Sequence, residues 1–175
     1  MVTLITASMR TPTMRAAVAV PTDEALREFC AREHARCFAC RPVAEGGLGL
    51  EFEVQADGTV RSEWSCPSGV ESYAGIVHGG ILATALDSAM VHVLFASGII
   101  ARTGELRVRY RRSVRTGTPA RVTARLCDAL RPLFRLEAEI LQDGVVCTRA
   151  TAKFMALESS HAPALAARAR EAAAR

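Results

Sequence analysis

The sequence predicts an α+β domain in which one antiparallel sheet wraps a single long buried helix. Residues 77–100 form the longest apolar stretch of the chain, as expected for a helix that is buried on most sides. Four runs of alternating apolar and polar residues follow, which is the pattern of half-buried antiparallel strands. With 175 residues, half of them hydrophobic, the chain can form one sizeable core but not two ordinary domains.

The first half of the chain predicts a short helix and a hairpin. Thr22 can cap an amphipathic helix over residues 25–35, whose first turn is preceded by acidic residues. Asp57-Gly58 is a tight-turn dipeptide between two alternating runs, so residues 48–54 and 60–64 are expected to pair.

In the second half, Gly79-Gly80 opens the long helix, and turn signals separate the strands that follow it. We expect these strands over residues 105–113, 120–129, 133–141 and 145–157. Residues 22–158 should form the single domain, with a disordered segment over 1–21 and an Ala/Arg-rich tail over 159–175.

Composition narrows the classes of partner. A formal net charge of +4 suits a small polyanionic ligand but is low for a dedicated nucleic-acid binder. Asp87 counts against a membrane span, because a carboxylate near the bilayer centre costs about 2.5–3.5 kcal/mol. The six cysteines lack the spacing of a disulfide scaffold and no secretory signal is recognisable, so we expect reduced thiols and a cytoplasmic location.

Asp87 is the most informative residue, because a buried ionised carboxylate is costly unless something compensates it. Gly79-Gly80 would expose helix amides to an approaching oxygen, which is the physics of an oxyanion site. Gly79 and Asp87 lie about 12 Å apart along the helix. Antiparallel helices across a two-fold axis would bring them together, so we infer a homodimer with shared sites. Alternatively, the glycines only permit a tight turn, and backbone or arginine partners hold Asp87 for packing.

A family resemblance rests on three features: the His78-Gly79-Gly80 motif, Asp87 nine residues after the histidine, and the run from Thr103 to Tyr110. Together they resemble the hotdog-fold acyl-CoA thioesterases, in particular the PaaI-like branch related to 4-hydroxybenzoyl-CoA thioesterases. The likeness covers about residues 37–157. It implies a curved antiparallel sheet around one central helix, dimers whose sheets join, and often tetramers.

The resemblance also implies catalytic roles. The amide of Gly79 would polarise the thioester carbonyl, and the partner subunit's Asp87 would act as nucleophile or as general base on water. Thr103 would provide a hydroxyl that orients the water or the carboxylate.

His78, Gly80 and Ser72 are expected to border the substrate, and His78 should also cap the turn into the helix. Ser72 departs from the family pattern, because well-studied members carry Asn six residues before the motif histidine. Glu71 beside it is a second carboxylate that could raise the pKa of Asp87.

The densest cationic cluster of the chain lies between residues 107 and 115. Coenzyme A carries a pyrophosphate and a 3'-phosphate, which arginine binds bidentately. Arg111, Arg112 and Arg115 are therefore the expected phosphate ligands. A solvated face is the alternative; nucleic acid is disfavoured because aromatic residues suited to stacking bases are lacking.

His34, Cys37 and Cys40 have the spacing H-x2-C-x2-C, and extending the expected hairpin would bring Cys66 near them. These four residues could form a structural zinc site. The alternatives are a packing role for the cysteines or a redox-active thiol pair.

These observations predict a thioesterase that hydrolyses an acyl- or aryl-CoA, with no cofactor required for catalysis. The alternatives are a non-catalytic acyl-CoA or acyl-carrier binding module and a hotdog-fold acyl-CoA hydratase or dehydratase, which would usually need a histidine beside the carboxylate. The partner is an acyl-CoA rather than nucleic acid or membrane, and the assembly is a homodimer or a dimer of dimers. The expected walls of the acyl pocket are Leu82, Leu86, Met90, Phe52 and Trp64.

Overall fold

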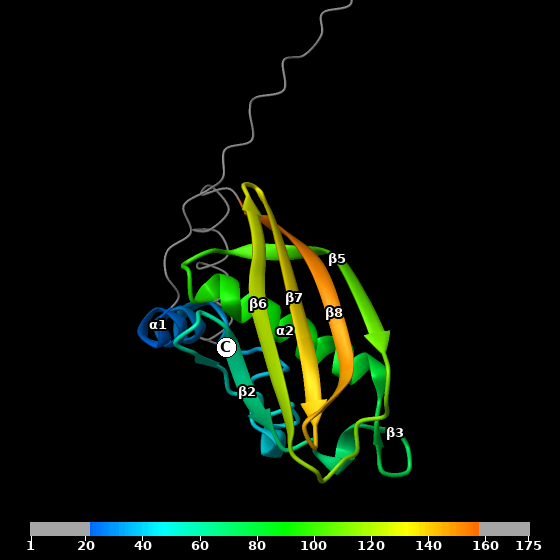
Figure 1. Cartoon of the computed structure of the whole chain (residues 1–175). Coiled ribbons are helices and arrows are strands. Elements are labelled where there is room, and N and C mark those ends of the chain that lie inside the picture. Colours follow the sequence, from blue (N-terminus) through cyan, green and yellow to red (C-terminus); the bar gives the residue numbers. More distant parts are fainter. Residues whose placement is uncertain (1–21, 158–175) are drawn as a thin grey trace, which may run out of the picture.

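The computed structural model describes residues 22–157 (Figure 1). The expected N-terminal segment over 1–21 and tail over 159–175 lie outside the described residues, as does residue 158. In chain order the elements are α1 (Asp23–Glu33), η1 (Val43–Glu45), β1 (Glu53–Val54), β2 (Val60–Trp64), η2 (Ser68–Val70), β3 (Glu71–Tyr73), β4 (Ile76–Val77), α2 (Gly79–Phe95), β5 (Ala101–Tyr110), β6 (Ala120–Leu130), β7 (Leu133–Gln142) and β8 (Val145–Ala156).

One antiparallel sheet of six strands, in the order β1-β2-β6-β7-β8-β5, packs on α2. Figure 1 shows the long strands β6, β7 and β8 side by side across the helix. The core lies between these two layers, where Leu86, Met90, Phe134 and Phe154 have no exposed surface. This architecture confirms the predicted α+β fold. No helix within residues 22–157 is long and apolar enough to cross a membrane.

The first hairpin is much shorter than predicted. Only Glu53–Val54 pairs with β2, in a register with Glu53 opposite Arg61. Further upstream, the amides of Leu48 and Leu50 donate to the carbonyls of Phe38 and Ala39 instead. The alternation from residue 48 therefore reflects burial against the loop that follows α1, which periodicity alone cannot distinguish from strand pairing.

Strand β5 forms an edge of the sheet, because it pairs only with β8. It begins at Ala101, four residues earlier than predicted, and its register shifts between Thr103 and Glu105. Such a bulge bends an edge strand and re-aims the neighbouring side chains. Here it adjoins Thr103, one of the expected catalytic residues.

Candidate active site

The N-terminus of α2 presents an amide without a partner. His78 is the N-cap residue, and its Nδ1 accepts a hydrogen bond from the Gly80 amide at 2.9 Å. Within the described chain, the Gly79 amide donates to no group. The hydroxyl of Tyr110 donates to the Gly79 carbonyl at 2.8 Å and thereby ties β5 to the helix start. The Gly79 amide, but not the capped Gly80 amide, is therefore available to a ligand oxygen.

Asp87 lies in the middle of α2 and is half-buried. The hydroxyl of Thr103 donates to its Oδ1 at 2.8 Å, and no residue of the described chain contacts Oδ2 with a hydrogen bond. Burial raises the pKa of Asp87 above its ordinary value, the Thr103 hydrogen bond opposes that rise, and the nearby Cys37 adds to it. The site therefore contains a carboxylate that is basic for its type and half-satisfied.

Asp87 belongs to a partly exposed stripe of α2. Gly80, Thr84, Asp87 and Val91 are spaced four, three and four residues apart, which places them on one helix face. The positions between them include Leu82, Leu86 and Met90, which are buried in the core against the sheet. These three, with Trp64, were expected to line the acyl pocket, but they are core residues, and the Trp64 indole donates to the Leu48 carbonyl at 2.9 Å. Phe52 instead packs on the ring of His92.

A mostly apolar groove of about 620 Å³ runs along the start of this stripe. Phe38, Val43 and Ile81 contribute apolar walls, and the groove reaches His78 and Thr84 on the helix. Phe38 and Val43 are about half exposed although they are apolar. The groove therefore offers a hydrophobic surface beside the free amide.

A cationic depression of about 660 Å³ lies where β5 ends, and Tyr110 connects it to the helix start. Arg109, Arg111 and Arg112 line it, and none of the three forms an ion pair with a described residue. Arg115 differs, because its guanidinium contacts Asp143 at 2.5 Å and its amide donates to the Gln142 side chain. The sequence prediction thus grouped Arg115, which is paired with Asp143, with Arg111 and Arg112, which have no ion-pair partner among the described residues.

Ser72 and Glu71 lie on the exposed strand β3. Glu71 accepts a hydrogen bond from the Thr116 hydroxyl at 2.7 Å, and it is not among the groups that shift the pKa of Asp87. No hydrogen bond within residues 22–157 joins Ser72 to Asp87 or to Thr103. The structure therefore does not bring β3 together with the carboxylate within one chain.

A cluster of histidine and cysteine side chains lies beside the second half of α2 and could hold a metal ion. The ligand atoms of His34, Cys37 and Cys40 lie within 4.8 Å of one another, and so do those of Cys30, His34 and His92. The Sγ atom of Cys40 is 3.4 Å from Nε2 of His92 and 4.0 Å from Nδ1 of His34. Sequence reasoning missed His92, because proximity across the fold gives no spacing signal, and it missed Cys30 although its spacing of four residues from His34 is one helical turn.

Cys66 is not part of this cluster, and its assignment as the fourth zinc ligand is a correction. Its thiol is fully buried, lies 3.8 Å from the Trp64 carbonyl and is next to Cys147. The inference failed because β1 has only two residues, so the hairpin register does not extend as far as Cys66.

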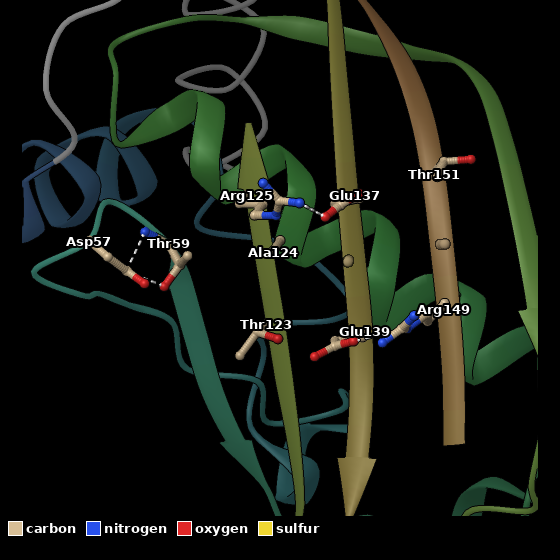
Figure 2. A pocket seen from close by; sticks show the side chains of 11 residues that line it. Asp57, Thr59, Thr123, Ala124, Arg125, Glu137, Glu139, Arg149 and Thr151 are labelled. Carbon is tan, nitrogen blue, oxygen red and sulfur yellow. Dashed lines mark hydrogen bonds and ion pairs between the residues drawn. The ribbon is translucent and has the colours of Figure 1, made fainter. Parts of the chain in front are cut away.

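The outer face of the sheet carries a separate groove of about 560 Å³ (Figure 2). The ion pairs Arg125–Glu137 and Arg149–Glu139 bridge neighbouring strands across it. None of the residues expected from the sequence to act in catalysis or binding lines this groove.

Comparisons with known proteins support the assignment of a family. Residues 74–148 match the Thioesterase superfamily, whereas no curated protein matches the chain. A phenylacetic acid degradation-related protein from Ralstonia eutropha JMP134 is 27% identical, with coverage of 69% of this chain and 94% of that one and a TM-score of 0.59. A longer thioesterase superfamily protein is 25% identical with a TM-score of 0.60; the match covers 63% of this chain and 57% of that one.

Two more distant structures share the fold. The E. coli PaaI protein from the phenylacetic acid degradation operon is 13% identical, with 78% of this chain and 96% of that one covered and a TM-score of 0.66. A hypothetical thioesterase protein from Streptococcus pneumoniae TIGR4, solved with coenzyme A, is 17% identical, with 75% and 96% covered and a TM-score of 0.61. Residues 74–148 of the chain therefore match the thioesterase superfamily, and the chain has the hotdog fold, with a six-stranded antiparallel sheet around one long central helix.

Proposed function

We propose that this chain is an acyl-CoA thioesterase that acts as a homodimer with shared active sites. The observation that carries the proposal is the state of Asp87: a half-buried carboxylate of raised pKa, held at one oxygen by Thr103, on the open stripe of a helix that starts with a free amide. The other oxygen of Asp87 forms no hydrogen bond with a described residue and is not a buried atom, so it is accessible to a water molecule or a substrate.

The dimer is proposed because the two halves of the site are separated within one chain. Gly79 and Asp87 are about 12 Å apart along α2, and one carbonyl cannot contact both. A second helix packed antiparallel on the stripe would place its Asp87 near the start of the first helix. The two-fold axis would also place Asp87 of the first helix near the start of the second. The unpaired edge of β5 beside Thr103 gives the two sheets a place to join.

In the proposed reaction, the Gly79 amide donates to the thioester carbonyl oxygen and stabilises the oxyanion that develops there. As general base, Asp87 takes a proton from water while the water oxygen bonds to the carbonyl carbon. The carbon–sulfur bond then breaks, and the thiolate leaves with the proton that Asp87 took. As nucleophile, Asp87 would instead bond to the carbonyl carbon and expel the thiolate, which gives a mixed anhydride; water then hydrolyses the anhydride, restores the carboxylate and supplies the proton for the thiolate.

The surroundings of the helix start fit both ends of an acyl-CoA. The apolar groove beside His78 would receive the acyl group. The unpaired guanidinium groups of Arg109, Arg111 and Arg112 would bind the phosphates, on the far side of Tyr110. The Streptococcus pneumoniae protein of the same fold was solved with coenzyme A, which supports this proposal.

The alternative enzyme class receives less support from the described residues. A hydratase or dehydratase would need a histidine beside the carboxylate, but His78 caps the helix and His92 is buried with both ring nitrogens in contact. The non-catalytic binding module differs from the proposal only in the need for Asp87, so it is left to experiment.

The test measures thiol release from a panel of aryl and fatty acyl-CoAs by the full chain, by Asp87→Asn and by Asp57→Asn. Asp57 undergoes the same chemical change on an exposed turn. We expect Asp87→Asn to lose about 1,000-fold in kcat/KM, and Asp57→Asn to match the unmodified chain. Hydrolysis that survives Asp87→Asn would contradict the mechanism. Tight acyl-CoA binding with no turnover in any of the three proteins would identify a binding module.

A further inference from the structure

The His/Cys cluster joins two parts of the chain that are distant in sequence. Cys30 comes from α1, His34, Cys37 and Cys40 come from the turn that follows it, and His92 comes from α2. Aromatic rings surround the cluster: Phe52 stacks on His92 with ring centroids 4.3 Å apart, and Phe95 meets His34 edge-on at 5.0 Å. Five potential metal ligands therefore meet in a largely apolar environment.

His92 is oriented as a metal-binding histidine would be. It is only 2% exposed, and its Nδ1 lies 2.6 Å from the Ser88 carbonyl, to which it can donate only when protonated at that nitrogen. The lone pair of Nε2 then points to the sulfur of Cys40 at 3.4 Å. A backbone carbonyl that fixes one ring nitrogen so that the other can bind a metal is the usual arrangement around metal-ligating histidines.

The distances between the ligand atoms are close to those of a tetrahedral site. With zinc–sulfur bonds of about 2.3 Å and zinc–nitrogen bonds of about 2.0–2.1 Å, neighbouring ligand atoms should be about 3.3–3.8 Å apart. The sulfur of Cys40 lies 3.4 Å from a ring nitrogen of His92 and 4.0 Å from a ring nitrogen of His34. The sulfur of Cys37 lies within 4.8 Å of the ligand atoms of Cys40 and His34. Cys37 and His92 do not belong to the same 4.8 Å group, so closing the site around an ion requires these two side chains to move toward each other.

We propose that His34, Cys37, Cys40 and His92 bind one zinc ion in a tetrahedral site with two sulfur and two nitrogen ligands. Mixed thiolate and imidazole ligands in tetrahedral geometry favour zinc among the common divalent ions. Cys30 is left out of this ligand set, because it shares no group with Cys37 or Cys40, whereas those two cysteines group together with His34 and Cys40 also lies 3.4 Å from His92.

The ion has a structural role, because it anchors the turn after α1 to the central helix. Phe38 lies between two of the ligands in sequence and forms a wall of the apolar groove. The ion therefore also fixes the position of that wall. This last consequence depends on the proposed acyl-CoA function, whereas metal binding itself does not.

The test uses the full chain, purified under reducing conditions, and measures zinc by elemental analysis. We expect about one zinc ion per chain, lost in Cys37→Ser and Cys40→Ser and retained in Cys30→Ser. Cys127→Ser, at an exposed cysteine outside the cluster, is the matched control. Replacement of zinc by cobalt should give the visible absorption bands of a tetrahedral ion and the charge-transfer band of a thiolate ligand, a readout that needs no variant.

Three outcomes would overturn the proposal. The first is a chain that carries no zinc and gives no cobalt spectrum after metal is added to the reduced protein. The second is a disulfide between Cys37 and Cys40 in the reduced preparation, detected by alkylation and mass spectrometry. The third is metal that Cys30→Ser loses and Cys37→Ser keeps. Because none of these measurements uses a thioester, the zinc proposal and the thioesterase proposal can fail separately.

Discussion

The two halves of α2 hold their polar side chains in different ways. In the second half, His92 is 2% exposed, with Nδ1 2.6 Å from the Ser88 carbonyl and Nε2 3.4 Å from the Cys40 sulfur. In the first half, Asp87 is half-buried and receives one hydrogen bond, from Thr103. The helix amide that precedes it, at Gly79, has no acceptor in the described chain.

The difference separates a group that has partners for its polar atoms within the described chain, even before the proposed zinc ion binds, from groups that the described chain leaves incomplete. Leaving a polar group partly desolvated and unpaired costs free energy. The fold avoids that cost at His92. At Asp87 and Gly79 the cost is offset only when a group from outside the chain forms a hydrogen bond with them. A substrate between two subunits would supply the missing partners at both positions.

Neutralising Asp87 should have the largest effect of the changes that test this contrast between the two halves of α2. We expect Asp87→Asn to lose about 1,000-fold in kcat/KM while its Tm at neutral pH rises. The pKa of Asp87 is raised by burial, so the folded state binds its proton more tightly than the unfolded state does. Stability therefore falls as pH rises through that pKa, and an asparagine escapes the loss. A lower Tm for Asp87→Asn would show that the carboxylate serves packing.

The matching change in the second half should have the opposite effect on stability. We expect His92→Ala to lower the free energy of unfolding by about 3 kcal/mol, because it leaves a cavity and removes the contacts of the imidazole with the Ser88 carbonyl and the Cys40 sulfur. Denaturant unfolding of both variants tests the contrast. Equal stability of His92→Ala and the unmodified chain would mean that the buried histidine contributes nothing to the fold.

Much of the fold follows from local patterns. The strands over 120–130, 133–142 and 145–156 have their predicted limits to within one residue, because tight turns separate strongly alternating runs. The first hairpin was overestimated and β3–β4 was missed. Leu48 and Leu50 bond to the loop after α1 instead of to β2, and β3 and β4 have only three and two residues, so neither region gives a periodic signal that identifies its partner.

The candidate site was predictable where its residues share one helix or a known motif spacing. Gly79 and Asp87 belong to this group, and the motif resemblance added Thr103. Contacts across the fold were not predictable: the pairing of Arg115 with Asp143 and the meeting of His92 with Cys40 depend on how separate elements pack. Tyr110 stands at the end of the cationic strand, but nothing in the sequence indicates its bond to the Gly79 carbonyl.

The helix start can be tested with Gly79→Ala. An added Cβ would come no closer than 3.4 Å to the Tyr110 ring, so the chain should fold normally. It would, however, occupy the approach to the free amide, and we expect kcat/KM to fall about 100-fold. Unchanged hydrolysis would exclude this amide as the oxyanion donor.

The same variant tests the shared site. If each site combines Gly79 of one subunit with the partner subunit's Asp87, then a heterodimer of Gly79→Ala and Asp87→Asn contains one intact site. Random reassociation of equal amounts should restore about one quarter of the unmodified activity. If both residues came from one chain, the mixture would stay inactive.

A smaller effect is expected at Thr103. Its hydroxyl lowers the pKa of Asp87, so Thr103→Val should raise that pKa further. Because the reaction needs the ionised carboxylate, the acid limb of the kcat/KM–pH profile should move to higher pH, and the plateau should fall about 10-fold. Thr103→Ser keeps the hydroxyl and should keep the profile of the unmodified chain. A profile that does not move in Thr103→Val would separate Thr103 from the titration of Asp87.

The smallest effects are expected in the cationic depression, where they concern binding alone. The double variant Arg111→Gln, Arg112→Gln removes two guanidinium groups that lack ion-pair partners in the described chain, so KM for acyl-CoA should rise about 10-fold at low salt with kcat unchanged. Arg115→Gln should raise KM less, because Arg115 is already paired with Asp143. The difference between the variants should shrink as salt screens the phosphates. An equal rise in KM for both would mean that Arg115 leaves Asp143 to bind the ligand.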